Sequence, residues 1–307
     1  MTRHVLDVTD FTATEVGTIL DLAERSPSEL GHPLGGSGVA LVFEKPSNRT
    51  RHSMEIAVTE LDGHPVYTRG EEVGFDTREP VEDIAVIMAG YHRIIAARVF
   101  EHETLARMVS AIDSSDLVSA SVVNMLSDRS HPLQAFADAL TMRQELGSLA
   151  GKTVAYVGDY NNVARSLAEI SLLLGMRMRF ACPAGFDASA VELDRLAGLG
   201  DGDVLQTDQP VDAVAGAHAV HTDTWVSMGQ EDEKAERRRI FNGFEVDGAL
   251  MAGADEGAIF MHCLPAYRGI EVAAEVIDGP RSRVYQQGHN RLHSARAVMA
   301  FILGVAP

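Results

Sequence analysis

Short apolar runs alternate with amphipathic segments along this chain, and this alternation constrains the fold more than any other feature. Runs such as 39–43 and 154–157 are shorter than a typical helix and bounded by turn residues, which is the pattern of buried strands. The predicted strands are 39–43, 94–97, 122–125, 154–157, 178–181, 219–221 and 259–261. Helical periodicity predicts helices near 12–26, 53–61, 80–89, 132–146, 163–174 and 291–303. Strands alternating with helices indicate a parallel α/β sheet.

The alternation stops once and then restarts. A long helical pattern over 132–146 ends at the turn 147–152, and a new strand follows it. We therefore predict an α/β protein with two doubly wound parallel-sheet domains, joined by this helix and with a cleft between them. Such clefts commonly bind small ligands.

Charge and composition exclude several classes of partner. The 307 residues include 26 Lys and Arg against 44 Asp and Glu, a formal net charge of −18. This balance argues against a nucleic-acid partner and against docking on an anionic membrane surface. No apolar run reaches the roughly 18 residues that span a bilayer. A polar N-terminus without a signal or transit pattern, and two distant cysteines (Cys182 and Cys263), predict a cytoplasmic protein.

Two segments imitate nucleotide-binding motifs. Gly151-Lys152-Thr153 resembles the end of a P-loop, but Leu146 stands where the first glycine belongs, and the tripeptide precedes a strand. The turn after the strand 154–157 lacks the glycine spacing of a dinucleotide-binding fold. No nucleotide cofactor is expected.

The segment 43–51 leaves an apolar strand and enters a helix, whose first N–H groups favour an anion. Ser47 and Thr50 add hydroxyl groups and Asn48 adds an amide. Arg49 and Arg51 add guanidinium groups that match phosphate geometry. The segment predicts a phosphate site, the alternative being a helix cap with solvated arginines.

Other candidates are ambiguous when taken singly. Arg98 ends a predicted strand, where it faces either the binding crevice or a surface salt bridge. His131 and Gln134 share one helix face, so they hold either a carbonyl and an amide or only the helix start.

Two strand-end segments are equally open. Asp223 could neutralise an amino group and Ser227 could bind a carboxylate, or the segment is a structural loop around Trp225. Cys263, after the strand 259–261, is either exposed to the crevice or a small buried apolar residue. No ligand spacing supports zinc there, and no metal site is predicted.

Taken together, these motifs resemble the aspartate/ornithine carbamoyltransferase family, and more closely its ornithine branch. The matching segments occur in the family's order over nearly the whole chain: 47–51, 131–134, 158–162, 223–229, 262–265 and 290–293. The Ser227-Met228-Gly229 and His262-Cys263-Leu264-Pro265 sequences point to the ornithine branch.

The resemblance implies a carbamoyl phosphate-binding domain over 1–146 and an ornithine-binding domain over 147–289. It also implies that the C-terminal helix, 290–307, packs back on the first domain. The expected reaction is carbamoyl transfer from carbamoyl phosphate to the δ-amine of L-ornithine, giving L-citrulline in arginine biosynthesis. The expected assembly is a homo-oligomer, a trimer, and no metal or organic cofactor is expected.

The resemblance also implies roles for individual residues. The implied catalytic residues are Arg49, Arg98, His131, Asp223 and Cys263. The implied carbamoyl phosphate-binding residues are Ser47, Asn48, Arg49, Thr50, Arg98, His131, Gln134, Cys263, Leu264 and Arg291. The implied ornithine-binding residues are Asn162, Asp223, Ser227 and Met228. Four cations, Arg49, Arg51, Arg98 and Arg291, are expected to converge on one dianion.

Four residues depart from the family pattern. Asn48 replaces a threonine, Tyr160 replaces a small residue beside the acceptor-binding asparagine, and His289 replaces a glutamate. Gly74 stands where the family has a glutamine. These changes bear more on the second substrate than on carbamoyl phosphate. The rival hypotheses are a carbamoyltransferase for another amine, such as a modified ornithine or putrescine, and a non-catalytic metabolite-binding protein on the same fold.

Overall fold

The computed structural model of the chain describes residues 2–225 and 234–306. It divides into two compact units, unit 1 (1–137 and 291–307) and unit 2 (138–290). Both units are built on wholly parallel sheets, so the predicted fold class is confirmed. The unit boundaries fall inside helices α6, Pro132–Leu146, and α13, Val284–Ile302.

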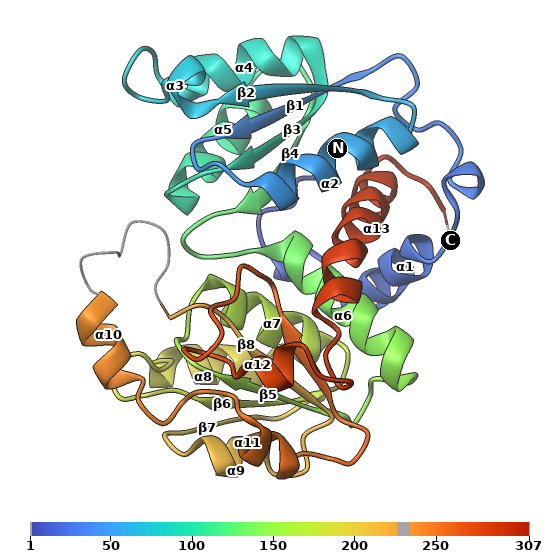
Figure 1. The fold of residues 1–307 in the computed structure, drawn as a ribbon. Helices are drawn as coiled ribbons and strands as arrows, with labels where there is room; N and C mark the ends of the chain where they lie inside the picture. Colours follow the sequence, from blue (N-terminus) through green and yellow to red (C-terminus); the bar gives the residue numbers. More distant parts are fainter. Residues whose placement is uncertain (1, 226–233, 307) are drawn as a thin grey trace. The chain divides into compact units, whose positions relative to one another are not determined.

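Unit 1 has a four-stranded sheet in the order β2-β1-β3-β4 (Figure 1). Its strands are β1 Gly38–Phe43, β2 His64–Arg69, β3 His92–Arg98 and β4 Ser121–Leu126. The helices are α1 Ala13–Ala23, α2 Asn48–Glu60, α3 Gly70–Val73, α4 Val81–Tyr91 and α5 His102–Asp113, with short 3₁₀ turns at Val8–Asp10 and Pro27–Glu29.

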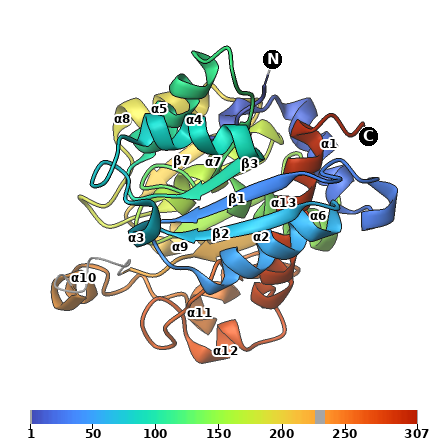
Figure 2. The ribbon, with the colours of Figure 1, turned by 90° about the horizontal axis from the view of Figure 1, so that it is seen from above.

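The core of unit 1 lies between the sheet and helices α4 and α5. Residues of β1, β3 and β4, such as Ala40, Ile95 and Val122, pack against apolar side chains of these two helices. Strands buried on both faces read as continuous apolar runs, which is why β1, β3 and β4 were predictable. Helix α2 lies beside β2 (Figure 2) and brings the start of α2 to the carboxyl end of β1.

Unit 2 has a five-stranded sheet in the order β7-β6-β5-β8-β9. Its strands are β5 Thr153–Val157, β6 Arg177–Ala181, β7 Val204–Thr207, β8 Ala219–Thr222 and β9 Ile259–His262. Its helices are α7 Asn162–Leu173, α8 Ala190–Ala197, α9 Pro210–Val214, α10 Lys234–Ile240, α11 Gly248–Ala252 and α12 Ala274–Ile277.

Two separate apolar clusters hold the faces of this sheet. Tyr156 and Phe180 lie in the cluster that includes Leu167 of α7 and Leu196 of α8. Val157 and Phe260 lie in the other cluster, with side chains of α9, α11 and α12. The sheet is therefore covered on both faces, as parallel sheets require.

The predicted helices and strands differ from the structure mainly in where they begin and end, and some elements of the structure were not predicted. The last helix begins at Val284 rather than 291, and α2 begins at Asn48 rather than 53. Strand β7 escaped prediction because none of its residues is fully buried, so it lacks an apolar run. Among the described residues, no helix combines the length and apolar character needed to cross a membrane.

Candidate functional site

The sheet of unit 1 has one topological switch point, between β1 and β3. From there β2 lies outside β1 and β4 lies outside β3. In open α/β sheets, ligands bind beyond the carboxyl ends of the strands at such a point, because the flanking loops diverge there. The loop 44–47 after β1 and Arg98 at the end of β3 flank this position, and the Glu44 N–H donates to the Arg98 carbonyl at 2.9 Å.

The start of α2 forms one wall of the unit 1 site. Ser47 is the N-cap, and its hydroxyl oxygen accepts from the Thr50 N–H at 3.4 Å. The same hydroxyl donates to Thr50 Oγ1 at 3.0 Å. Thr50 is buried, while Asn48 and Arg49 are exposed. The helix start therefore presents N–H groups and hydroxyl groups, the donors expected for an anion.

Arg291, from the far end of the chain, completes this wall. Its Nη2 donates to Thr50 Oγ1 at 2.6 Å, and its Nη1 donates to Gln134 Oε1. Arg291 is only 7% exposed and Gln134 is 1% exposed. The guanidinium therefore lies beside the start of α2 and adds a buried positive charge to the N–H and hydroxyl donors there, a combination that suits an anionic ligand.

His131 lies within the electrostatic reach of Arg98 and Arg291. Burial, and then the charges of Arg291 and Arg98, hold the pKa of His131 well below its usual range. The imidazole is therefore neutral at pH 7. A neutral imidazole can donate one N–H to a carbonyl oxygen without adding a charge beside the two arginines.

Two other cations near this site behave differently from each other. Arg51 donates to Glu55 at 2.8 Å, and its guanidinium lies 3.8 Å from the centre of the Tyr67 ring. Arg51 thus already has an anionic and an aromatic partner in its own unit. Lys45, to which the sequence analysis assigned no role, lies 4.4 Å from the centre of the Phe100 ring. Burial and then the charge of Arg98 lower the pKa of Lys45.

Unit 2 repeats the topological arrangement with different chemistry. Its switch point lies between β5 and β8. The loop 158–161 follows β5 and Asp223 follows β8. Gly158 has φ 141°, a conformation that side chains rarely adopt, and it opens the tight turn after β5.

Asp223 is the centre of the unit 2 site. Its Oδ2 accepts from Asn161 Nδ2 at 3.0 Å and its Oδ1 accepts from the Cys263 thiol at 3.1 Å. Asp223 is 7% exposed. Both donors are neutral, so neither of them balances a negative charge on Asp223. Such a site suits a cationic or amine-bearing molecule.

The segment after β9 is held by a second buried histidine. His262 Nδ1 accepts from the Leu264 N–H at 2.9 Å, and its Nε2 lies 3.3 Å from Glu271 Oε1. These contacts hold Leu264 at φ 58°, a left-handed conformation that is uncommon for leucine. The Leu264 backbone is thus fixed in one conformation beside Cys263.

Asp223, His262 and Cys263 bring three possible metal-ligand atoms within 4.8 Å of one another. The His262 nitrogens, however, are already occupied by the Leu264 N–H and by Glu271. The thiol of Cys263 also donates to Asp223. These three side chains therefore form a hydrogen-bonded group in the structure.

The remaining predicted acceptor-binding residues are placed as follows. Asn162 is the first residue of α7 and is partly exposed. Ser227 and Met228 lie outside the described residues.

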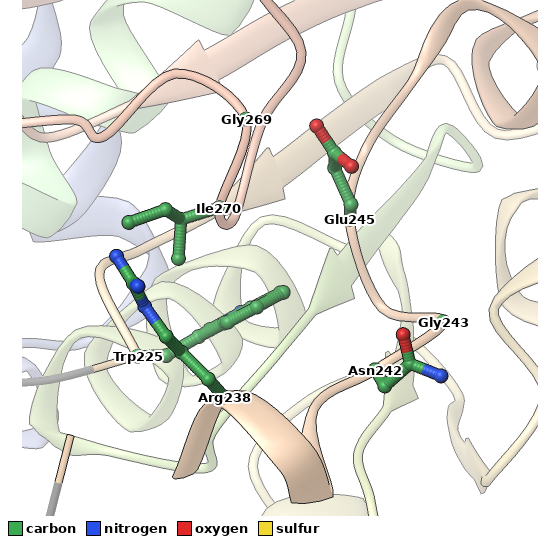
Figure 3. Close-up of a pocket in the computed structure, with 7 residues that line it drawn as sticks. All are labelled: Trp225, Arg238, Asn242, Gly243, Glu245, Gly269 and Ile270. Atoms are coloured by element: carbon green, nitrogen blue, oxygen red, sulfur yellow. The ribbon is translucent and has the colours of Figure 1, made fainter. Parts of the chain in front are cut away.

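The sequence allows Trp225 to be either a site residue or a core residue. Its ring stacks on Phe241, with 5.3 Å between ring centres, and it is 5% exposed. It also lines a pocket of about 260 Å³ (Figure 3) together with Arg238, Asn242, Gly243, Glu245, Gly269 and Ile270. None of the other lining residues belongs to the predicted site, so this tryptophan is chiefly a core side chain of unit 2.

The departures from the family pattern have structural settings. Gly74 ends α3 in the left-handed conformation, φ 63°, that favours glycine. His289 is exposed on α13. The hydroxyl of Tyr160 donates to Glu192 of α8 at 2.7 Å, and its ring packs on Phe180 of β6. Tyr160 is thus directed toward β6 and α8, whereas Asp223 follows β8 on the other side of β5.

Three supporting residues had no predicted role. Asn161 caps α7, accepting from the Val163 and Ala164 N–H groups, while its Nδ2 holds Asp223. Arg237 pairs with Asp159 at 2.8 Å, and Ser127 accepts from His102 or donates to it at 2.9 Å. An asparagine directly before a helix is a recognisable cap signal, but the other two contacts join distant segments.

Comparison with known proteins assigns the family. Residues 3–144 match the model described as the aspartate/ornithine carbamoyltransferase carbamoyl-P binding domain, and residues 150–302 match the Asp/Orn binding domain. An ornithine carbamoyltransferase of Thermus thermophilus is 45% identical, covering 98% of this chain and 97% of that protein. One of Acidothermus cellulolyticus is 44% identical, covering 100% and 98%.

Solved structures agree with this result. The ornithine carbamoyltransferase from Pyrococcus furiosus superposes with a TM-score of 0.92 at 38% identity, covering 100% of this chain and 98% of the other. The matches extend over both units and include the segments that carry the two switch-point sites. The chain belongs to the aspartate/ornithine carbamoyltransferase family.

Proposed function

We propose that the protein transfers the carbamoyl group of carbamoyl phosphate to the δ-amine of L-ornithine, giving L-citrulline and phosphate. The observation that carries this proposal is the pairing of opposite chemistries at equivalent places in the two units. Unit 1 gathers the buried cations Arg98 and Arg291 with Thr50 at its switch point. Unit 2 gathers Asp223 with two neutral donors at its own.

In this mechanism the phosphate binds at the start of α2. The N–H groups of 47–50, the Thr50 hydroxyl, and the side chains of Arg98 and Arg291 are its ligands. Arg49 is exposed at the helix start, and its guanidinium is a further ligand of the bound anion. His131 and Gln134 hold the carbamoyl oxygen and nitrogen, and the Leu264 carbonyl accepts from the same nitrogen.

The acceptor is held by the residues of unit 2. Asn162, Ser227 and the Met228 backbone bind its α-amino and α-carboxylate ends, and Asp223 and Cys263 lie near the δ-amine. An alkylammonium group has a pKa of about 10.4 in water, so the amine must lose a proton before attack. Desolvation and the cations of the phosphate site lower that pKa, because both disfavour a further positive charge.

The neutral amine then attacks the carbamoyl carbon. Negative charge develops on the carbamoyl oxygen, where the N–H of neutral His131 and the guanidinium of Arg98 stabilise it. The carbon–oxygen bond to phosphate breaks, and phosphate leaves with the electron pair. The amine proton passes to the leaving phosphate.

We further propose that the protein acts in arginine biosynthesis in the cytoplasm as a homotrimer. Light scattering on the purified protein tests the assembly, since a trimer has three times the chain mass of 33.1 kDa. Any other mass would contradict the proposed trimer without affecting the reaction.

An amine-panel assay tests the reaction. Purified protein is incubated with carbamoyl phosphate and ornithine, N-modified ornithines, putrescine or lysine, and the carbamoylated products are separated. Citrulline is the expected main product. Turnover of another amine without citrulline would replace ornithine as the acceptor, and carbamoyl phosphate binding without any turnover would support a non-catalytic binding protein. An Arg49→Ala variant is expected to keep the fold and lose activity; unchanged activity would refute the role of Arg49.

A further inference from the structure

We propose that Tyr160 is a positioning residue for the acceptor site: its phenol ties the loop after β5 to α8 and thereby fixes Asn161 against Asp223. This inference rests on the proposed function, because it concerns the amine-binding side of that reaction. It assigns a role to a residue that departs from the family pattern.

Three contacts hold Tyr160 in one orientation. Its hydroxyl donates to Glu192 Oε1 at 2.7 Å, its ring meets Phe180 edge-on with 5.1 Å between ring centres, and its N–H donates to the Phe186 carbonyl at 2.8 Å. Burial, and then the bond to Glu192, raise the pKa of Tyr160 well above its usual range. The hydroxyl therefore keeps its proton and remains a donor at every physiological pH.

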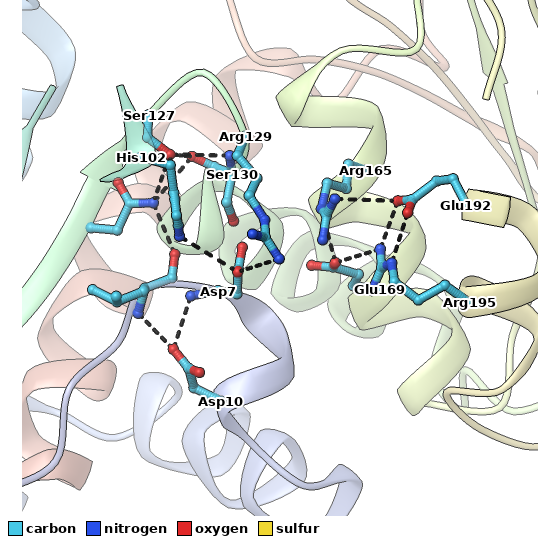
Figure 4. Close-up of polar contacts among 12 residues, drawn as sticks. Asp7, Asp10, His102, Ser127, Arg129, Ser130, Arg165, Glu169, Glu192 and Arg195 are labelled. Atoms are coloured by element: carbon cyan, nitrogen blue, oxygen red, sulfur yellow. Dashed lines mark hydrogen bonds and ion pairs between the residues drawn. The ribbon is translucent and has the colours of Figure 1, made fainter. Parts of the chain in front are cut away.

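The acceptor of this bond is itself fixed by a network of charges (Figure 4). Arg195 donates from Nε to Glu192 Oε2 and from Nη2 to Glu192 Oε1, both at 2.7 Å. The same Nη2 donates to Glu169 at 2.8 Å, and Arg165 donates to Glu169 at 3.1 Å. Glu169 is fully buried in α7. The Tyr160 hydroxyl is thus bound to a carboxylate that is held on both α8 and α7.

The next residue in the chain, Asn161, binds on the opposite side of β5. Asn161 has extended backbone angles, φ −101° and ψ −172°, and its side chain reaches Asp223 on the β8 side. Tyr160 reaches Phe180 and Glu192 on the β6 side. The loop after β5 is therefore held on both sides: Tyr160 binds on the β6 side and Asn161 binds on the β8 side. Each set of contacts restricts the movement of the loop and so helps to keep the other set in place.

This arrangement predicts a defect confined to the acceptor. Removing the phenol hydroxyl leaves the Phe180 contact but releases the loop from α8, so Asn161 and Asp223 lose part of their fixed geometry. A small loss of placement is costly for binding and orientation. The phosphate ligands belong to unit 1, whereas Tyr160 belongs to unit 2.

The experiment is a double-mutant cycle with Tyr160→Phe, Glu192→Ala and both together. Each single variant is expected to raise the KM for ornithine about tenfold, the size of effect typical of a hydrogen bond to a charged group, with little change in the KM for carbamoyl phosphate. The double variant should be no worse than Glu192→Ala alone, because Glu192→Ala already removes the Tyr160 bond in addition to the bonds from Arg195. Glu192→Gln keeps an acceptor oxygen and should restore most of the ornithine KM. Tyr91→Phe removes a hydroxyl from a side chain that is 75% exposed and should match the unchanged protein.

The inference would be overturned by an unchanged ornithine KM in Tyr160→Phe, or by effects of Tyr160→Phe and Glu192→Ala that simply add. A general loss of stability would instead raise both KM values or lower the active fraction, and it would also refute a positioning role. If the unaltered protein carbamoylates a different amine, the proposed acceptor is wrong, and the cycle is repeated with that amine as its probe.

Discussion

The two units use the same framework for opposite purposes. Each has a parallel sheet with a switch point, and in each the loops that flank this point carry the candidate site. Beside the switch point of unit 1 the buried charged groups include Arg98 and Arg291, whereas the central charged group of the unit 2 site is Asp223. The comparison teaches that topology decides where a ligand can bind, while a few side chains decide the charge of that ligand.

The two sites also differ in how their side chains are supported. Arg291 of unit 1 donates to Thr50 and Gln134, which lie far from it in the chain. Asp223 is supported by Asn161 and Cys263 at the ends of neighbouring strands. Substitutions on the two sides should therefore separate phosphate binding from amine binding.

The largest effect is expected at Arg98. Arg98→Ala should lower kcat/KM for carbamoyl phosphate by about 10²–10³-fold, the range for a lost charge-stabilising donor. It should also abolish the thermal stabilisation by inorganic phosphate. Arg93, exposed at the other end of β3, provides the matched control, and Arg93→Ala should leave both readouts unchanged. Equal behaviour of the two variants would remove Arg98 from the phosphate site.

Asp223→Asn tests the other side of the comparison. We expect kcat/KM for ornithine to fall on the order of 100-fold, because a buried charge that pairs with the ligand is lost. Stabilisation by inorganic phosphate should persist, since Asp223 belongs to unit 2. The exposed Asp201→Asn variant serves as the control. Loss of phosphate stabilisation in Asp223→Asn would contradict the division of labour between the units.

Ser127→Ala tests the turn between β4 and α6, which precedes His131 in the chain. Ser127 is fully buried, and its Oγ lies 2.9 Å from His102 Nδ1 and 3.2 Å from both Asn124 Nδ2 and the Ser130 N–H (Figure 4). Leaving these groups without their partner should lower the free energy of unfolding by about 1–3 kcal/mol in urea titrations. The exposed Ser110→Ala change in α5 should cost little, so equal losses would show that Ser127 has no special role.

The last prediction concerns the pH dependence of stability that the buried His221 causes. Burial, and then the charge of His262, lower the pKa of His221 to about 3, against an ordinary value near 6.5. Below pH 6.5 the unfolded chain binds a proton that folded His221 does not, so stability is lost as pH falls from 6.5 toward 3. The free energy of unfolding should drop by about 1.4 kcal/mol per pH unit from this group. His221→Gln should flatten the profile between pH 6.5 and 5; an unchanged slope would contradict the assignment.

The fold was largely predictable because buried parallel strands leave clear apolar runs. Strands β1, β3, β4 and β5 were identified within two residues of their ends, and α6 was identified at both ends. Helix α13 began seven residues earlier than predicted, because its first turns carry polar residues such as Gln287 that are nevertheless buried. Periodicity cannot reveal buried polar side chains whose partners lie elsewhere in the chain.

The candidate site was predictable only in part. A local helix-start pattern predicts Ser47 and Thr50, and a strand end predicts Arg98; the structure has these residues at the start of α2 and the end of β3. The contacts of Arg291 with Thr50 and of Tyr160 with Glu192 join segments that no local pattern relates. For Tyr160 the sequence allowed a side chain that covers the pocket, and only the position of α8 and Phe180 shows where the ring goes.

The placement of Arg291 also has a consequence for folding during translation. Unit 1 consists of residues 1–137 and 291–307, so its anion site includes a group synthesised almost last. A ribosome must translate all of unit 2 before Arg291 can reach Thr50. The nascent N-terminal segment therefore lacks the full stabilisation that ligand binding provides. Carbamoyl phosphate can stabilise unit 1 completely only once translation is nearly finished.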